Sequence, residues 1–303
     1  MSGRTLLIAI TVMGFSLAGC NRGGSGSGQE SSGDYQATGT LDQETQEQFN
    51  TAKRIFYSLP SPLEVAMLIK NAGAEYDNGL LNPTTNTSRY ITSKSKALNL
   101  GIYSTDLSYA SLFDQTQATL DYIEAAKLMA DGLNILDAIN QETIDQLEAN
   151  INDREVIIDI ISETLMNSSS YLKENGLEAT ASITLIGGWV EGLYIATSLV
   201  DAKNIESNKL LERIVDQKLS IDIMVNLLNE TPEDEDAMLI LEDVNALKAI
   251  FDKISIKQGE VTAVENPETD ITTLKSESSM EISPKVFQEL KDKVEEIRNS
   301  YIS

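Results

Sequence analysis

Histidine is absent from this chain of 303 residues. Its absence excludes a histidine general base, a serine or cysteine nucleophile activated by histidine, and a zinc site with histidine ligands. Aromatic residues are also scarce, at 6% of the chain with a single tryptophan. A surface built to stack sugar rings is therefore not expected. Carboxylates, lysines and tyrosines remain as candidates for acid-base chemistry.

Cysteine occurs only once, at position 20, so the chain has no second thiol with which to form an intramolecular disulfide. Basic residues are few, because 23 Lys and Arg face 47 Asp and Glu, for a net charge of -24. A field of this sign repels nucleic acid and anionic lipid headgroups. We therefore expect a domain that is held together by its apolar core and has no nucleic-acid partner.

The N-terminus has the pattern of an export signal. Arg4 is the only charged residue before Cys20, and an apolar segment of about 13 residues, Leu6–Ala18, follows it. This segment is shorter than the ~20 residues that a membrane-spanning helix needs. It runs into Leu17-Ala18-Gly19-Cys20, which resembles the lipobox of bacterial lipoproteins. The resemblance implies that residues 1–19 are a signal peptide and that Cys20 carries lipid such as palmitate, which anchors the protein in a membrane.

Residues 20–40 comprise the lipidation site and a stretch rich in Gly and Ser, without apolar periodicity. We expect this stretch to be a disordered, flexible tether with an r.m.s. span of roughly 25 Å. No run of acidic residues directly follows Cys20, whereas such a run is associated with surface display in some Bacteroidota-type lipoproteins. This favours an outer-membrane anchor that faces the periplasm, and surface exposure stays open as the alternative.

From residue 41 to residue 255 apolar residues recur at helical spacing with short connections, which predicts an all-α domain, either a multi-helix bundle or an irregular α-array. We expect a bend or interruption near Gly101, a cap at Asp114 for the next helix, and a start at Thr231-Pro232 for the last one. No segment has a convincing period-two pattern. The predicted helices cover about 42–58, 61–71, 93–112, 114–133, 140–150, 153–174, 177–200, 205–229 and 232–255.

Residues 256–282 are a second polar stretch, which we expect to be a linker. Ser283 and Pro284 then supply the N-cap and the first-turn proline of a detached, amphipathic C-terminal helix over 283–303. Its apolar stripe must be buried, either on the helical domain, which tethering favours, or on a partner or second copy. The stripe consists of Phe287, Leu290, Val294, Ile297 and Tyr301.

Two segments carry residues that suit a binding or catalytic pocket. In Gly187–Tyr194 three glycines indicate the close approach of another backbone, and Glu191 near Trp189 is placed to be a carboxyl group with a raised pKa. The alternative is a tightly packed helix in which Glu191 pairs with Lys or Arg. In Tyr103–Asp114, tyrosines and carboxylates line a polar pocket or serve as caps and interhelical hydrogen bonds. The candidate pocket residues are Tyr103, Asp106, Tyr109, Asp114, Trp189, Glu191 and Tyr194.

The run of four acids at 233–236 suggests a cation site, but no calcium-binding loop pattern surrounds it. Acidic residues are also favourable at a helix N-terminus, through the helix dipole. We therefore predict neither a metal site nor a cofactor.

Three segments, together with the lipobox, resemble an uncharacterised family of Bacteroidota lipoproteins. They are Phe56–Pro62 (FYSLPSP), Asn99–Tyr103 (NLGIY) and Gly187–Gly192 (GGWVEG), and the resemblance covers most of residues 50–255. It implies a lipoprotein address and no assigned activity, so no functional residue follows from it.

Three functions are compatible with these observations. The first is a lipid-anchored protein of the cell envelope whose helical domain is a non-catalytic binding or scaffold module for another envelope protein. The second is a periplasmic small-solute-binding module with a pocket near Tyr103, Asp106 and Glu191. The third is a carboxylate-based hydrolase. A deep polar pocket with two converging acids would favour the hydrolase, a pocket without them the solute-binding module, and no pocket the scaffold.

Overall fold

In the computed structural model, the described residues are 75–135, 141–153, 156–157, 159–161, 163–164, 171–172, 175–200, 209–266 and 271–303. The predicted signal peptide, Cys20, the tether and the helices expected over 42–58 and 61–71 lie outside them, as does much of the helix expected over 153–174. The described part is predominantly helical, which confirms the predicted all-α class.

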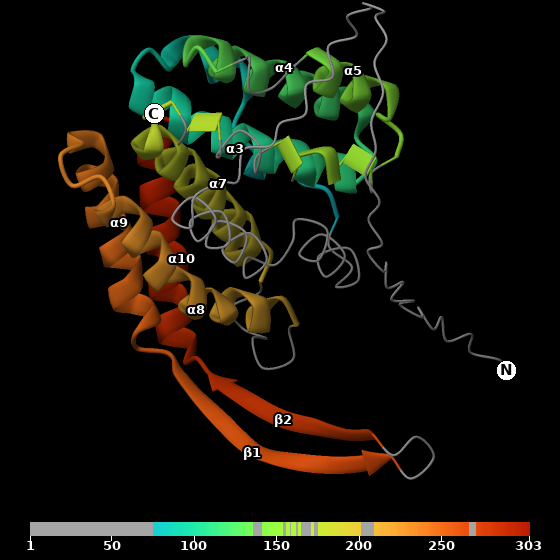
Figure 1. Ribbon diagram of the computed structural model, residues 1–303, viewed down its shortest axis with the longest axis vertical. Helices are drawn as coiled ribbons and strands as arrows, with labels where there is room; N and C mark the ends of the chain where they lie inside the picture. Colours follow the sequence, from blue (N-terminus) through green and yellow to red (C-terminus); the bar gives the residue numbers. More distant parts are fainter. Residues whose placement is uncertain are drawn as a thin grey trace, which may run out of the picture. The chain divides into compact units, whose positions relative to one another are not determined.

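Two short 3-10 helices, η1 (Asn78–Leu80) and η2 (Thr84–Arg89), precede the first long helix of the described part. The helices that follow pack into an irregular bundle (Figure 1). They are α3 (Ser93–Leu112), α4 (Thr116–Gly132), α5 (Gln141–Ala149), α7 (Glu178–Leu199), α8 (Lys209–Asn229), α9 (Glu235–Phe251) and α10 (Pro284–Tyr301).

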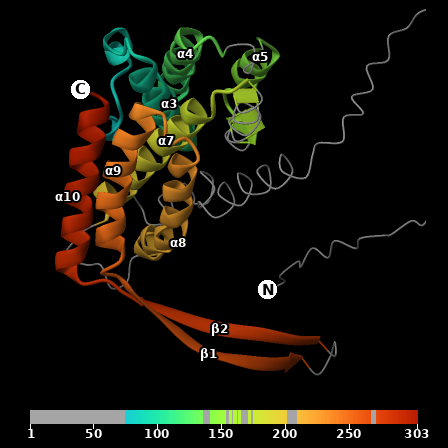
Figure 2. The same cartoon turned by 60° about the vertical axis from the view of Figure 1, so that its left-hand side comes forward.

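Helix α7 is the central element of this bundle. It contacts α3, α8, α9 and α10, and Figure 2 shows these helices gathered around it. Within the described part of the chain, α7 is the one helix whose length and composition would allow it to cross a membrane, but 67% of its apolar window is buried inside the protein. A core helix that is apolar on every side meets the same criteria.

Glycines allow α3 and α7 to lie in backbone contact. A Cβ atom added to Gly101 would lie 2.0 Å from the carbonyl oxygen of Thr184, and one added to Gly187 would lie 2.2 Å from that of Leu98. No side chain fits at such distances. The close approach predicted for Gly187 is therefore confirmed, whereas α3 runs through Gly101 without the expected interruption. Gly101 is needed for packing on α7.

Of the caps predicted at Asp114, Thr231 and Ser283, one agrees with the structure and two differ. Ser283 accepts a hydrogen bond from the amide of Val286 (3.3 Å) at the start of α10, as predicted. The N-cap of α4 is Gln115, and Asp114 instead takes a left-handed conformation (φ 57°) in the turn after α3. Asp tolerates this conformation better than most residues.

Helix α9 starts later than predicted. Its N-cap is Asp234, whose carboxylate accepts a hydrogen bond from the amide of Ala237 at 2.8 Å. The amide of Asp234 donates to the carbonyl of Thr231 at 3.0 Å, so Thr231 and Pro232 form a turn before the helix. The acidic run thus supplies the cap and the first helical turn, where the helix dipole favours negative charge.

Residues 256–282 were expected to be a linker, but the chain there forms an antiparallel hairpin of β1 (Ser255–Asn266) and β2 (Ile271–Glu281), drawn as two arrows in Figure 1. The register of the pair shifts between Gln258 and Val261. This irregularity adds a residue to β1 and changes the phase of its alternation. A search for a continuous period of two therefore does not find the strand.

The C-terminal helix α10 docks on the bundle of its own chain, against α7, α9 and α3. The predicted apolar stripe is buried, with Phe287, Leu290 and Val294 fully inaccessible. Burying each of these side chains contributes about 1.5–3 kcal/mol. Of the two possibilities for this helix, docking in cis is the one the structure shows.

The α3–α7 contact predicts different effects for alanine at two glycines of the same helix. Gly187→Ala should lower the free energy of unfolding by roughly 3 kcal/mol, the upper end for overpacking, because its Cβ meets the Leu98 carbonyl. Gly192→Ala is the matched control, because its Cβ would meet only Thr105 Cγ2 at 3.9 Å. It should be neutral or stabilising by up to about 1 kcal/mol. Thermal unfolding followed by circular dichroism measures both, and equal effects would contradict the proposed contact.

Candidate functional site

Three helices bring charged side chains together in the interior. Asp106 comes from α3, Glu191 from α7 and Arg298 from α10, and their exposures are 0%, 0% and 5%. Glu191 and Arg298 form a two-pronged ion pair, in which Arg298 Nε donates to Glu191 Oε2 at 2.9 Å and Nη2 donates to Oε1 at 2.9 Å. A planar guanidinium matches a carboxylate in this geometry, which gives the pair directional specificity as well as charge.

Arg298 has two further partners. Its Nη2 also donates to the carbonyl oxygen of Leu80 at 3.0 Å, and its guanidinium carbon lies 4.5 Å from the centre of the Tyr194 ring. A cation over an aromatic face is stabilised by the ring quadrupole. The buried positive charge is therefore satisfied on several sides.

Asp106 is the second carboxyl group of the cluster. Its Oδ2 accepts a hydrogen bond from the amide of Asn82 at 3.0 Å. Burial, and then the negative charge of Glu191, raise the pKa of Asp106 well above its usual value. The interaction between the two carboxyl groups raises the pKa of Asp106 and lowers that of Glu191. We infer that the proton resides on Asp106, where it can be donated to the ionised carboxyl group of Glu191.

Two observations fit this assignment of the proton. Asp106 Oδ1 is buried and has no hydrogen-bond donor among the described residues, which disfavours a negative charge on this carboxyl group. Burial also raises the pKa of Glu191, but Arg298 and Asp106 oppose that rise by stabilising the ionised form. One proton and one arginine thus compensate two carboxyl groups, and the interior holds a neutral unit.

Asparagines extend the network to the end of α10. Asn82 Nδ2 donates to Asn99 Oδ1 at 2.9 Å, and Asn99 Nδ2 donates to the carbonyl oxygen of Tyr301 at 2.9 Å. Tyr90 donates to the carbonyl oxygen of Ile302 at 3.3 Å. The last carbonyl groups of a helix have no partner within it, so these bonds from the preceding part of the chain attach α10 through its backbone.

The structure gathers only part of the candidate pocket. Asp106, Glu191 and Tyr194 lie around Arg298. Tyr103 is fully buried and donates to the carbonyl of Pro83 at 3.1 Å; burial, then Tyr90 and Asp106, raise its pKa. Asp106, Glu191 and Tyr103 are buried and Tyr194 is partly exposed. The pairing of Glu191 with Arg298 agrees with the tightly packed alternative, in which Glu191 pairs with Lys or Arg.

The other candidates serve separate contacts. The Tyr109 ring stacks on that of Tyr76 at 5.6 Å between centroids. Trp189 Nε1 donates to Gln217 Oε1 on α8 at 3.0 Å. Asp114 is exposed in the turn after α3.

Sequence reasoning missed Arg298 and the two asparagines. Arg298 lies between two residues of the apolar stripe, Ile297 and Tyr301. A cation beside an otherwise apolar helix face was the signal that could have identified it. Asn82 and Asn99 had none, because polar residues of this kind are common in loops and caps.

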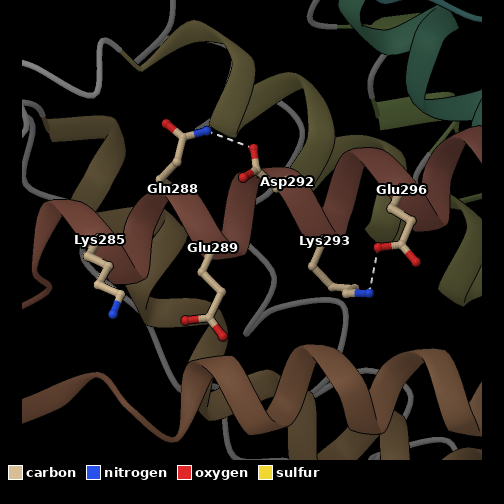
Figure 3. Close-up of a pocket in the computed structure, with 6 residues that line it drawn as sticks. All are labelled: Lys285, Gln288, Glu289, Asp292, Lys293 and Glu296. Carbon is tan, nitrogen blue, oxygen red and sulfur yellow. Dashed lines mark hydrogen bonds and ion pairs between the residues drawn. The ribbon is translucent and has the colours of Figure 1, made fainter.

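A groove in the described part lies elsewhere, along the outer side of α10 (Figure 3). Four of its polar side chains form two pairs, in which Gln288 donates to Asp292 at 2.7 Å and Lys293 contacts Glu296 at 2.5 Å, and Glu289 pairs with Lys253. None of the candidate pocket residues lines it. The lining residues are Lys285, Gln288, Glu289, Asp292, Lys293 and Glu296.

Within the described ranges, no three carboxylates come together as a ligand set for a metal ion. Comparison with models of known protein families, with curated proteins and with solved structures finds no match to this chain. The buried cluster is therefore interpreted from its own chemistry.

Asp106 should make stability depend on pH. Because folding raises its pKa, its contribution to stability is complete below the ordinary value of about 3.8. As pH rises above that value, unfolding releases a proton, and stability falls by up to about 1.4 kcal/mol per pH unit until the folded pKa is reached. Asp106→Asn removes this proton and keeps a donor for Glu191 and an acceptor for Asn82. The melting temperature of Asp106→Asn minus that of the unsubstituted protein should therefore increase from pH 4 to pH 8.

Asp106→Leu is the control for this experiment, since it removes the acceptor for Asn82 together with the carboxyl group. It should melt below the unsubstituted protein at the acidic end of the range. If the melting temperatures of Asp106→Asn and of the unsubstituted protein differed by the same amount at every pH, the protonated state of Asp106 would be contradicted.

Proposed function

We propose that this protein is a lipid-anchored lipoprotein of the bacterial cell envelope whose helical domain is a non-catalytic binding or scaffold module. One observation carries the non-catalytic part. The two buried carboxyl groups of the candidate pocket, Asp106 and Glu191, have 0% exposure and are engaged with Asn82 and with Arg298, respectively. A general acid must reach the atom that it protonates, and the pair in a glycosidase leaves room for water or substrate.

The proposed export and lipid anchoring rest on the sequence. An n-region with Arg4, a short apolar segment and Leu17-Ala18-Gly19-Cys20 occur in the order that lipoprotein export requires. The resemblance to Bacteroidota lipoproteins supports the same address. An acidic domain on a Gly/Ser tether would then lie beside an outer membrane, facing the periplasm.

The solute-binding and hydrolase alternatives have less support. Buried acids with raised pKa values do occur at functional sites, but here α10 covers them, and Arg298 of that helix occupies Glu191. Either alternative would require α10 to leave the bundle, exposing the stripe that it buries.

The address predicts that Cys20→Ser abolishes membrane partitioning and labelling with palmitate while the domain remains folded. The lipid would be the membrane-affine element that this substitution removes. Cell fractionation in high salt, with and without metabolic labelling, measures both effects. A Cys20→Ser protein that still sediments with membranes would reveal a second anchor.

The non-catalytic assignment predicts a structural effect for Glu191→Gln. The variant keeps the volume and one hydrogen bond but leaves Arg298 without a counter-charge, so it should melt lower. It should nevertheless retain the phenotype of the unsubstituted gene when it complements a deletion strain. Glu289→Gln, which removes the exposed partner of Lys253, is the control and should melt almost unchanged.

A folded Glu191→Gln protein that behaves like the deletion would refute the scaffold proposal. It would favour a site in which the carboxylate acts on a ligand. Folding of each variant is verified beforehand by circular dichroism at the growth temperature.

A further inference from the structure

The β1–β2 hairpin leaves two strand edges open. It is a two-stranded sheet within the described part of the chain, so the outer backbone groups of each strand have no strand beside them there. A two-stranded hairpin is marginally stable alone in water, and three or more strands are normally needed. An open edge of this kind is a template for pairing with another strand.

The two edges differ in how well they suit such pairing. In β1 the register shifts between Gln258 and Val261, and a bulge of this kind bends and twists a strand edge. In β2, Ile271–Glu281, no extra residue interrupts the register, and proline does not occur. The open edge of β2 is therefore the better template.

The sequence of β2 is complementary to itself. The middle residue of Ile271–Glu281 is Ser276. If two copies of β2 pair antiparallel over their full length, Ser276 lies on the two-fold axis and faces its own copy. The same register places Lys275 of each copy opposite Glu277 of the other. Opposite charges at directly opposed positions stabilise a sheet, and an isologous contact repeats the pair twice.

No like charges meet in this register. Glu281 is opposed to Ile271, Thr272 to Met280 and Leu274 to Ser278. The corresponding full-length pairing of β1 has no such complementarity, because Lys257 would be opposed to Val264. The charge pattern thus selects β2 and a second copy of the same chain.

We propose that the open edge of β2 is a self-association surface, through which two copies of this protein form a four-stranded antiparallel sheet in the order β1, β2, β2 and β1. The contact supplies the additional strands that the hairpin lacks. It goes beyond the scaffold function proposed above and rests on the hairpin alone, so it does not depend on acylation.

Disulfide cross-linking tests the register. In the full chain carrying Cys20→Ser, Ser276→Cys introduces the only thiol, at a position that faces its own copy. Mild oxidation at micromolar concentration should convert most of this variant to a covalent dimer, because paired Cα atoms lie about 4.5–5.5 Å apart. Ser279→Cys is the matched control. Its two copies would lie roughly 20 Å apart at ~3.4 Å per residue, beyond the reach of a disulfide.

Charge reversal tests the complementarity in the same background. Lys275→Glu should weaken self-association about tenfold or more in sedimentation equilibrium, since like charges then oppose one another at two places. Adding Glu277→Lys restores opposite charges in the proposed register and should restore the dimer. Helical content and melting temperature of the bundle serve as folding controls.

Three results would overturn the proposal. The first is a Ser276→Cys protein that cross-links no more than Ser279→Cys, whether both fail or both react through random collision or face-to-face stacking. The second is a Lys275→Glu variant that associates as strongly as the unsubstituted chain. The third is a double variant that stays as weak as Lys275→Glu, which would show that the charges do not meet.

Discussion

The ion pair between Glu191 and Arg298 constrains the whole bundle. An apolar stripe tolerates small displacements of a docked helix, because hydrophobic contact has no direction. A buried ion pair does not tolerate such displacements, since losing either of its two hydrogen bonds leaves charge unsatisfied in the interior. Helix α10 is therefore placed in register on α7 by Arg298, while Phe287 and Leu290 supply the driving force. The partly exposed Tyr194 beneath the guanidinium completes the arrangement.

Backbone contact between α3 and α7 has a second consequence for this cluster. Because Gly101 and Gly187 bring the two helices together, Asp106, a little more than one turn after Gly101, reaches the carboxyl group of Glu191. Two like charges would repel one another there. Burial and then this repulsion raise the pKa of Asp106, and a proton on its carboxyl group would remove the repulsion. Close packing and the raised pKa thus have one cause.

The described helices were largely predictable, because apolar spacing and caps such as Ser283-Pro284 are local signals. The contacts between these helices were not predictable. Glu191 and Arg298 are separated by 107 residues, and nothing in either segment specifies the other. A bend or an interruption was expected near Gly101, and the interruption does not occur. Glycine has the same local signature whether it breaks a helix or admits a neighbour. The hairpin was missed because the bulge in β1 breaks the period of two, and the start of α9 was missed because Thr231 and Asp234 are both good caps.

The separation of Glu191 from Arg298 also orders events during synthesis and export. Glu191 of α7 is synthesised 107 residues ahead of Arg298. Under the proposed export as a lipoprotein, it would also enter the translocation channel first. During that interval Glu191 lacks its cation, and burying it in the ionised form would carry a large free-energy penalty. The interior around α7 therefore reaches its final form only after α10, which carries Arg298, has been made.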